Sequence, residues 1–477
     1  MDRSLRNLYI ALTAGFVALA LLLGYWQVVA AGSLQDRAGN PQTIQRERLV
    51  DRGRILSADG KVLAASRARR VRGQQVFERI YPQDELTAHP VGYTSEREGK
   101  TGLESTWNRF LSGSYGTEPL LQRLNLREKR GADVHTHLDS RVQQVAVDAL
   151  AGQRGAVVAL DPRTGGVVAM ASAPTFDPNE VARDFAAIRD RPDAPLLNRA
   201  SGGTYPPGST FKVVTATAAL ESGLYNPGSR FDDTGSFRNT GGAITNFGRR
   251  VFGQHTLRQA LTNSINTTFA RIVVTLGAAR LGATMSAYGF GERPPVDLPA
   301  GEVAVSGRRR DGSLLPNDQP GEDVARLAIG QERLEATPLQ MAMVAAAIAN
   351  EGTVLAPQLM SRITDRGGSN VREQRPEEIG QAASATTARR LTEMMRGVVD
   401  EGTGTAAALT GLSVAGKTGT AETGDTGRNQ AWFIGFAPAE NPEIAVAVVI
   451  EDTAGTGGGV AAPVAGAVMQ AAVDVGR

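Results

Sequence analysis

Residues 155–170 read GAVVALDPRTGGVVAM, and this stretch indicates the fold of the chain. The apolar runs 155–160 and 167–170 have the length of strands, and turn residues separate them, which predicts two antiparallel strands. Two more apolar runs, Trp432–Phe436 and Ile444–Ile450, lie near the end of the chain. Because helix candidates fill the sequence between the early and the late strands, we predict an α+β fold with one antiparallel sheet assembled from both ends of its domain.

The helix candidates around these strands carry apolar residues at intervals of three and four. They lie at 142–150, Val213–Leu220, Leu339–Ala349 and about Pro463–Val475. Residues 32–140 differ, because they are polar, rich in arginine and contain short β-like pieces. We therefore predict three parts. These are a tail and transmembrane anchor at 1–31, a small β-containing pedestal domain at 32–140, and a large α+β domain at 141–477.

The composition excludes several classes of function. Hydrophobic residues make up 41% of the 477, which is enough for a sizeable core. The 51 basic and 49 acidic residues leave a net charge of +2, which argues against a general nucleic-acid binder. The absence of cysteine removes disulfides, thiol catalysis and cysteine-based metal sites. The four histidines form no H-E-x-x-H pair, so we expect no metal ion, and we expect no cofactor.

The N-terminal stretch from Leu8 to Ala31 contains no charged residue. About 20 helical residues span the bilayer core of about 30 Å, so we expect a single-pass anchor in the cell membrane. Arg3 and Arg6 precede the stretch, and the rest of the chain would lie outside the cytoplasm. The alternative is a signal peptide cleaved after Ala31, but its apolar region would exceed the usual 7–15 residues.

The segment Tyr205-Pro-Pro-Gly-Ser-Thr-Phe-Lys212 places a serine and a lysine at the start of an apolar helix. Ser209 and Lys212 are three residues apart and would share one helix face. A serine hydroxyl becomes a nucleophile when a neighbouring base takes its proton, and a lysine with a lowered pKa can be that base. In the alternative, Ser209 only caps the helix and Lys212 is solvated, since about 0.25 such matches are expected by chance.

Two further motifs carry suitable side chains. Ser264-Ile-Asn266 offers a hydroxyl that could relay a proton and an amide that could bind a substrate, although this pattern is common by chance. Lys417-Thr-Gly-Thr420 offers an amine and two hydroxyls that could bind a carboxylate. Gly419 would let a substrate backbone approach closely. About 0.05 matches to the Lys-Thr-Gly motif are expected by chance.

The three motifs gain weight from their combination. They follow one another in this order, with separations of 55 and 153 residues. Lys212 and Lys417 are two of only five lysines among the 51 basic residues. Arginine could not replace either lysine in proton transfer, because its guanidinium does not lose its proton in proteins. We therefore predict that the three motifs converge on one pocket that performs serine acyl transfer.

This motif set resembles that of serine β-lactamases and penicillin-binding proteins. Over nearly its whole length the chain is similar to class B penicillin-binding proteins, most of all to the actinobacterial penicillin-binding protein A group. Residues 52–55 and 99–104 resemble the juxtamembrane and pedestal motifs of the family, and residues 328–331 and 402–404 are also family-like. One departure is Asn429-Gln-Ala431, where many relatives have a histidine, and we expect it to tune the site.

The resemblance implies a penicillin-binding transpeptidase fold, with an antiparallel sheet flanked by helices and an all-helical part. It implies D,D-transpeptidation of peptidoglycan stem peptides, with β-lactams as inhibitors. In that reaction Ser209 is the nucleophile, Lys212 the base, and Ser264 the proton relay held between Lys212 and Lys417. The substrate would be bound by four residues: Asn266, Thr418, Gly419 and Thr420. A membrane glycosyltransferase of the shape, elongation, division and sporulation family is the implied partner.

Two alternatives remain at this point. A D,D-carboxypeptidase or a β-lactamase would use the same site with water as the acceptor, but the anchor and pedestal favour an enzyme held near nascent glycan. A regulatory scaffold would instead use the anchor and residues 32–140 to activate a membrane glycosyltransferase. A domain for glycosyl transfer in this chain is not expected, because about 110 residues between the anchor and the large domain are too few.

Overall fold

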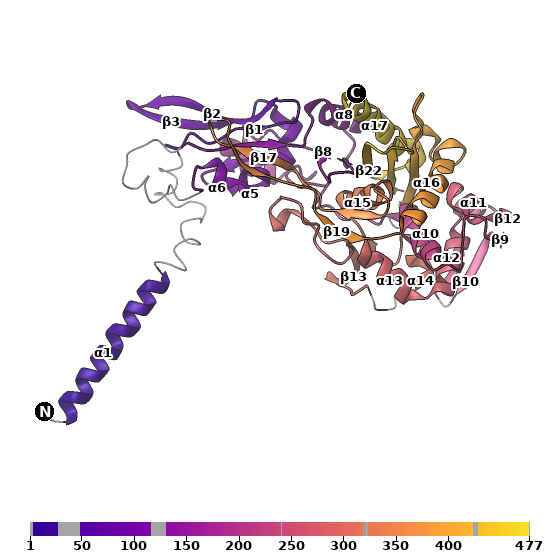
Figure 1. Ribbon diagram of the computed structural model, residues 1–477, viewed down its shortest axis with the longest axis horizontal. Coiled ribbons are helices and arrows are strands. Elements are labelled where there is room, and N and C mark those ends of the chain that lie inside the picture. Colours follow the sequence, from indigo (N-terminus) through magenta and orange to yellow (C-terminus); the bar gives the residue numbers. More distant parts are fainter. Residues whose placement is uncertain are drawn as a thin grey trace.

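The main body is built on a five-stranded antiparallel sheet with the strand order β20–β21–β22–β7–β8. Two of its strands, β22 and β8, are labelled in Figure 1. The computed structural model describes residues 3–26, 48–115, 130–239, 241–317, 319, 323–422 and 428–476. The strands are β7 Gly155–Leu160, β8 Val167–Ala173, β20 Ala415–Glu422, β21 Asn429–Ala437 and β22 Ile444–Thr453. Because β22 pairs with β7, the predicted sheet assembled from both ends of the domain is confirmed.

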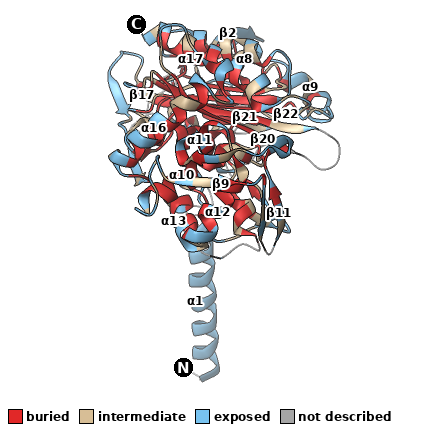
Figure 2. Cartoon of the chain, turned by 90° about the vertical axis from the view of Figure 1, so that its right-hand side faces the viewer, coloured by how far each residue is buried: buried red, intermediate tan, exposed pale blue. Residues whose placement is uncertain are grey.

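Helices cover both faces of this sheet, so its strands are largely buried (Figure 2). The covering helices are α8 Ser140–Leu150 and α17 Ala462–Gly476 on one face and α15 Pro338–Ala349 on the other. Helix α8 begins where the Asp139 carboxylate accepts hydrogen bonds from two backbone N–H groups. Predicted helices at all three positions are thus confirmed, and the predicted α+β class is confirmed with them.

A helical part lies against the β20 edge of the sheet. Its helices are α10 Lys212–Glu221, α11 Leu257–Thr262, α12 Asn266–Leu276, α13 Ala278–Ala287, α14 Val324–Leu327 and α16 Ala385–Asp400. Helix α10 is buried along nearly its whole length, between α12, α13 and α16. Two small hairpin-like sheets, β9–β12 and β10–β11, adjoin α12; their strands are Arg230–Asp233, Gly253–Thr256, Ser236–Asn239 and Gly242–Thr245.

The pedestal region contains a six-stranded sheet with the order β18–β17–β6–β1–β2–β3. Its strands are β1 Ile55–Leu56, β2 Val62–Val71, β3 Gln74–Ile80, β6 Asp133–Thr136, β17 Met360–Thr364 and β18 Asn370–Glu373. Strands β17 and β18 come from the sequence of the large domain, and β17 pairs with β6. The sheet therefore extends beyond the predicted pedestal boundary at residue 140 and joins the two regions through backbone hydrogen bonds.

The buried side chain of Glu104 links residues 52–55 and 99–104, which resemble the juxtamembrane and pedestal motifs of the family. The Glu104 carboxylate is fully buried and accepts hydrogen bonds from Arg52 at 2.7 Å and from Arg79 at 2.5 Å. The two guanidinium charges outweigh the cost of burial and hold the pKa of Glu104 below its usual range. Arg52 also donates to the Asn108 side chain at 2.8 Å. Arg52, Arg79 and Glu104 thus form one buried ionic core, which joins the segments 52–55 and 99–104.

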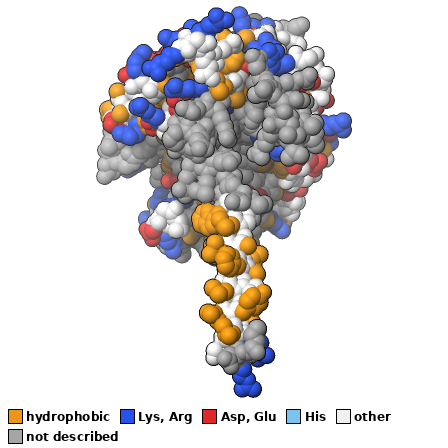
Figure 3. Space-filling model, turned by 90° about the vertical axis from the view of Figure 1, so that its left-hand side faces the viewer, with side chains coloured by type: hydrophobic (Ala, Val, Ile, Leu, Met, Phe, Trp, Pro, Cys, Tyr) orange, Lys and Arg blue, Asp and Glu red, His pale blue; other side chains and the backbone are white. Residues whose placement is uncertain are grey.

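The N-terminal helix α1 (Arg3–Gly24) has 22 residues, and none of them is buried. Figure 3 shows hydrophobic side chains along the helix and basic side chains at its tip. The helix is long and apolar enough to cross a membrane. Residues 27–31 of the predicted anchor lie outside the described residues. A second segment, Gly457–Gly476, also has sufficient length and apolarity, but half of it is buried against the sheet.

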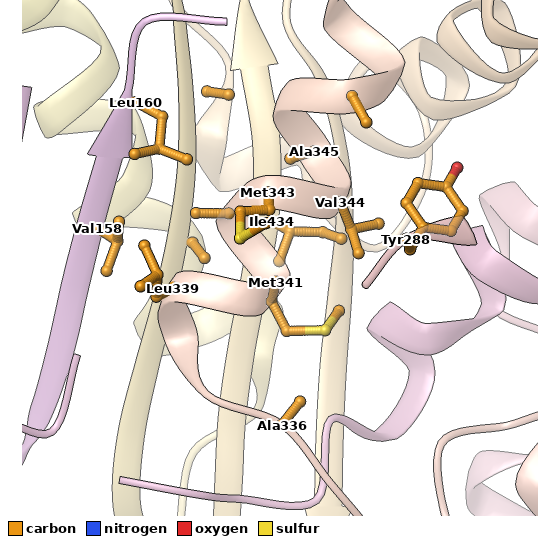
Figure 4. Packing of buried hydrophobic residues seen from close by; sticks show 14 of the residues in the cluster. Val158, Leu160, Tyr288, Ala336, Leu339, Met341, Met343, Val344, Ala345 and Ile434 are labelled. Atoms are coloured by element: carbon orange, nitrogen blue, oxygen red, sulfur yellow. The ribbon is translucent and has the colours of Figure 1, made fainter. Parts of the chain in front are cut away.

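The core beneath the helical part is centred on α15 (Figure 4). Leu339, Met341 and Val344 are fully buried, and Ile434 of β21 lies beside the helix. Burying a side chain of this kind stabilises a fold by about 1.5–3 kcal/mol relative to exposing it. The packing therefore gives the strands and the neighbouring helices a fixed relative position, on which the geometry of the site depends.

Candidate active site

Ser209 lies at the start of the helical segment that carries Lys212. A 3-10 turn at Gly208–Phe211 leads directly into α10. Gly208 adopts a positive φ of 53°, and a Cβ there would also lie 3.3 Å from Thr420 of β20. Its N–H donates to the Gly330 carbonyl at 3.1 Å. The glycine thus lets the serine turn lie against the sheet edge, and it leaves Ser209 half-buried.

The three predicted motifs meet around the Ser264 hydroxyl. Lys212 Nζ lies 3.1 Å from Ser264 Oγ, and Lys417 Nζ lies 3.0 Å from the same oxygen. Lys212 is contributed by α10, Ser264 by the turn between α11 and α12, and Lys417 by strand β20. Both lysine side chains are fully buried. The predicted position of Ser264 between two amines is therefore present in the structure.

Burial has a direct effect on the two amines. Desolvation, and then the neighbouring Lys417 charge, lowers the pKa of Lys212 well below its usual range. Desolvation lowers the pKa of Lys417 to about 7. A lysine with a lowered pKa is neutral at an accessible pH and can accept a proton. The site therefore holds the type of base that a serine nucleophile requires.

The hydrogen bonds of Lys212 define where its lone pair is available. Its Nζ donates to the Ser264 carbonyl at 2.7 Å and to Asn266 Oδ1 at 2.6 Å, and both of these groups act only as acceptors. A neutral amine has two N–H donors, which these two bonds use. Its lone pair then remains for a hydroxyl proton, either that of Ser264 or that of Ser209.

Ser264 occupies a strained backbone position. Its φ is +57°, which is uncommon for a residue with a side chain. The Ser264 N–H donates to the Leu261 carbonyl, and the Ile265 N–H donates to the Ala260 carbonyl, so the turn after α11 is held on both sides of Ser264. Such strain costs about 1–3 kcal/mol and persists where the surroundings impose it. Here it aims the hydroxyl at the two amines.

Asn266 begins α12 and is engaged on both ends of its amide. Its oxygen accepts from Lys212, and its nitrogen donates to the Thr245 carbonyl at 2.8 Å. The nitrogen has a second hydrogen that the Thr245 contact does not use. The predicted binding of a stem amide by Asn266 stays a prediction, and it would use that hydrogen.

Strand β20 forms the edge of the sheet beside the serine turn (Figure 2). Thr418 and Thr403 share a hydrogen bond of 2.6 Å between their hydroxyls. Thr420 Oγ1 accepts from the Gly457 N–H at 3.1 Å. A Cβ at Gly419 would lie 2.7 Å from the Pro207 carbonyl, so glycine permits the close approach of strand and turn. All three predicted residues of β20 are therefore next to the amines and the serine turn.

Two contributions to this arrangement were not predicted from the sequence. Thr403 follows α16 and fixes the Thr418 hydroxyl, and Gly457 fixes the Thr420 hydroxyl. The glycines on both sides of Thr403 were the signal available in the sequence, because they occur in a family-like segment. Gly457 stands among three consecutive glycines, which indicate only a flexible or tightly packed loop.

Comparison with known proteins places this geometry in a family. Residues 155–470 match the penicillin binding protein transpeptidase domain, and residues 52–134 match the penicillin binding protein A dimerisation domain. The peptidoglycan D,D-transpeptidase PbpA of Mycolicibacterium smegmatis is 36% identical over 512 residues, with 100% of both chains covered. The peptidoglycan D,D-transpeptidase MrdA of Escherichia coli is 29% identical, and the match covers 83% of this chain and 70% of that protein.

A solved structure agrees with the sequence comparison. The penicillin G acyl-enzyme complex of penicillin-binding protein A from M. tuberculosis aligns with a TM-score of 0.79 and 34% identity. The alignment covers 89% of this chain and 99% of that chain. The predicted fold and the predicted family are both confirmed. The chain therefore belongs to the penicillin-binding protein transpeptidase family.

Proposed function

We propose that this chain cross-links peptidoglycan as a serine D,D-transpeptidase whose nucleophile is Ser209. The observation that supports this best is the position of the Ser264 hydroxyl, which lies 3.1 Å from Lys212 Nζ and 3.0 Å from Lys417 Nζ. Ser209 lies one helical turn before Lys212, so one amine can serve both hydroxyls. The family to which the chain belongs supports the choice of stem peptides as substrates and of β-lactams as inhibitors.

In the first half-reaction, the Ser209 hydroxyl gives its proton to the neutral Lys212 amine as its oxygen attacks the D-Ala–D-Ala carbonyl carbon. The tetrahedral intermediate then collapses, and the C–N bond to the terminal D-alanine breaks. The proton on Lys212 passes through the Ser264 hydroxyl to the leaving amine. Lys417 holds that hydroxyl at 3.0 Å and so keeps the relay in place. The products are an ester on Ser209 and free D-alanine.

Two backbone N–H groups, those of Ser209 and Thr420, would stabilise the oxyanion in this step. Donors that are fixed before the reaction are effective, because they need no reorganisation when charge develops. The hydroxyls of Thr418 and Thr420 would bind the terminal carboxylate, and Gly419 would allow the peptide to lie close to β20. The hydrogen bonds that orient these hydroxyls, from Thr403 and Gly457, support this assignment.

In the second half-reaction, an amine on a neighbouring stem attacks the ester carbonyl. Its proton moves to Lys212 through Ser264, the bond between the carbonyl carbon and Ser209 Oγ breaks, and the serine regains a proton. A new amide then links the two stems. Water in place of the amine would give hydrolysis, as in a D,D-carboxypeptidase or a β-lactamase.

We propose that α1 anchors the chain in the cell membrane and that the catalytic domain lies outside the cell. The length and apolarity of α1 support the anchor, and the substrate supports the location of the domain. We also propose that a membrane glycosyltransferase of the shape, elongation, division and sporulation family is the partner. Its new glycan strands would pass to a transpeptidase held at the membrane surface.

The test is mass spectrometry of the full chain in detergent after incubation with a fluorescent penicillin. We expect a covalent adduct on Ser209 that is absent in Ser209→Ala. Ser222→Ala is the matched control, because Ser222 lies at the other end of α10 and donates only to the Ala219 carbonyl. A folded chain without an adduct on Ser209 would contradict the proposal. Loss of the adduct within minutes would instead identify a β-lactamase.

A further inference from the structure

A buried cluster lies beside the segment that leads to the serine turn. The Tyr205 hydroxyl donates to Glu451 Oε1 at 2.5 Å, and Arg199 Nε donates to the same carboxylate oxygen at 2.9 Å. Glu451 is part of β22, and Tyr205 lies four residues before Ser209. The cluster therefore joins the segment that leads to the nucleophile to a central strand of the sheet.

Burial makes these contacts specific. The Arg199 side chain is 1% exposed and that of Glu451 is 8% exposed. The remaining Arg199 nitrogens donate to the carbonyls of Ala194 and Asp193, so each nitrogen of the guanidinium has an acceptor. Burial raises the pKa of Tyr205, which keeps its hydroxyl a proton donor. The other carboxylate oxygen of Glu451 pairs with the partly exposed Arg154 at 3.1 Å. The buried Arg199 has few alternative geometries, because moving it away from Glu451 leaves its charge unpaired.

Other contacts attach the same segment to the sheet. Trp432 of β21 donates from Nε1 to the Pro206 carbonyl at 3.0 Å, and the Tyr205 ring packs edge-on against Trp432 with centroids 6.1 Å apart. The Tyr205 N–H and carbonyl also pair with Ala336. The backbone pairing with Ala336 and the ring contact with Trp432 therefore hold Tyr205, and its hydroxyl reaches Glu451 of β22.

The strands that receive these contacts are paired, through β21, with strand β20, which carries the second oxyanion donor, Thr420. Trp432 pairs with Gly419, the residue before Thr420, and Glu451 follows Ile450, which pairs with Ala431. Strand β20 is thus paired with β21, and the segment before the serine turn is hydrogen-bonded to β21 and β22. A shift of the Tyr205 segment along the sheet would change the separation of the Ser209 and Thr420 N–H groups.

We infer that Tyr205 and Glu451 are positioning residues that fix the spacing of the two oxyanion donors. This inference rests on the proposed function, because it assumes that Ser209 and Thr420 form the oxyanion hole. Removing an oxyanion donor outright costs about 10²–10³ in kcat, so displacing one should cost less. Catalysis also loses rate steeply when reacting groups are misplaced by about 1 Å.

The sharpest variant is Tyr205→Phe, which removes one hydroxyl and keeps the ring against Trp432. We expect the acylation rate constant for penicillin to fall about tenfold, with no change in the dissociation constant of the non-covalent complex. The affinity for an acylaminomethyl boronic acid, whose tetrahedral adduct occupies the oxyanion hole, should fall by the same factor. The penicilloyl ester should also be released about tenfold more slowly, because that step uses the same donors.

Tyr81→Phe is the matched control. Tyr81 is a buried tyrosine of the pedestal region whose hydroxyl accepts from the Thr94 N–H at 2.8 Å. Its loss should lower the melting temperature by a similar amount without changing acylation. Glu451→Gln is a second variant with the same expected direction, because the neutral amide holds both Tyr205 and Arg199 more weakly.

The outcomes separate the two levels of the argument. If Tyr205→Phe acylates no more slowly than Tyr81→Phe, or if only the non-covalent dissociation constant changes, the positioning role is wrong while the proposed function stands. If the wild-type chain forms no adduct on Ser209 in the same assay, the proposed function fails and this inference fails with it. A parallel loss of acylation rate and boronic acid affinity supports the inference.

Discussion

At the scale of single residues, the site depends on keeping two lysines out of water. Lys212 and Lys417 are fully buried, and both have lowered pKa values because the charged form is poorly solvated. This placement costs the fold stability and supplies a base near neutral pH. The chain thus gives up folding free energy at the position where the reaction needs a neutral amine.

Replacing Lys212 with arginine should slow acylation strongly, because it puts a permanent positive charge where the reaction needs a neutral amine. Arginine cannot act as the base, and general base catalysis contributes about 10²–10⁴-fold to a rate. We expect the second-order rate constant for penicillin acylation of Lys212→Arg to fall by about that factor. Lys61→Arg, at an exposed position of the pedestal region, is the control and should react at the wild-type rate. Normal acylation by Lys212→Arg would show that another group is the base.

The lowered pKa of Lys417 predicts a particular dependence of stability on pH. Its pKa is about 7 in the folded chain and about 10.4 in an unfolded chain, so the unfolded state binds more protons between these values. The buried lysine therefore destabilises the fold fully below pH 7, and this destabilisation decreases as the pH rises from 7 to 10. A pKa shift of this size lowers the free energy of unfolding by at most about 3–5 kcal/mol.

Lys417→Met should therefore unfold at a higher temperature than the wild type near pH 6.5, although it loses activity. The difference should shrink towards pH 9.5, where the wild-type lysine is neutral. Thermal unfolding of both proteins across this range provides the measurement, with Lys61→Met as the control. A difference that grew with pH would mean that burial does not lower the pKa of Lys417.

At this scale the sequence identified short motifs that the structure brings together, with Lys212 and Lys417 within 3.1 Å of the Ser264 hydroxyl. The catalytic roles of these residues and of Ser209 stay predictions. Thr403 and Glu451 were not predicted, because each acts through contacts with residues distant in the sequence, Thr403 with Thr418 and Glu451 with Tyr205. The glycines on both sides of Thr403 were a weak signal, and no local pattern around Glu451 predicts its contacts.

At the scale of elements, the turn after β22 packs against the backbone of β20. Gly457 is in close contact with the backbone there, since a Cβ would lie 2.2 Å from the Gly419 carbonyl oxygen and 2.3 Å from that of Trp432. The residue belongs to the Gly457–Ala461 turn that leads into α17. The substrate-binding edge of the sheet therefore depends on the absence of a single side chain.

Gly457→Ala should move β20 and weaken the site. Overpacking of this kind costs about 1–3 kcal/mol, and we expect slower penicillin acylation together with a lower melting temperature. Gly459→Ala is the matched control in the same turn, because its Cβ would approach an atom no closer than 3.4 Å. Equal effects of the two substitutions would mean that the loss does not come from contact with β20.

The predicted strands and helices of the large domain lie close to their observed positions, because each is a continuous apolar run or carries apolar residues at helical spacing. Strands β17 and β18 of the pedestal sheet were not predicted. The residues of β18 are exposed and mostly polar. Strand β18 pairs with β17, and β17 pairs with β6, which lies more than 200 residues earlier. Pairing at that distance is decided by the whole fold and not by local composition.

At the scale of the whole molecule, replacing Glu104 tests whether its ion pairs with Arg52 and Arg79 stabilise the pedestal region. Glu104→Gln leaves two buried arginines without their anion, which should cost about 3–5 kcal/mol. We expect faster hydrogen exchange in β1, β2 and β3. Glu78→Gln is the control, since Glu78 forms an exposed pair with Arg67 at 3.0 Å, and such pairs contribute about 0–1 kcal/mol. Unchanged exchange in Glu104→Gln would assign the stability of this region to its apolar contacts.

The strand order of the two large sheets also determines when the chain can fold. During synthesis, β6 must wait for β17 at residue 360, and β7 must wait for β22 at residue 444. A nascent chain released before residue 360 would therefore have neither sheet complete, and its strand edges would stay open to wrong partners. Assembly from such remote partners is intrinsically slow, so most of this polypeptide needs protection from aggregation until β22 has been made.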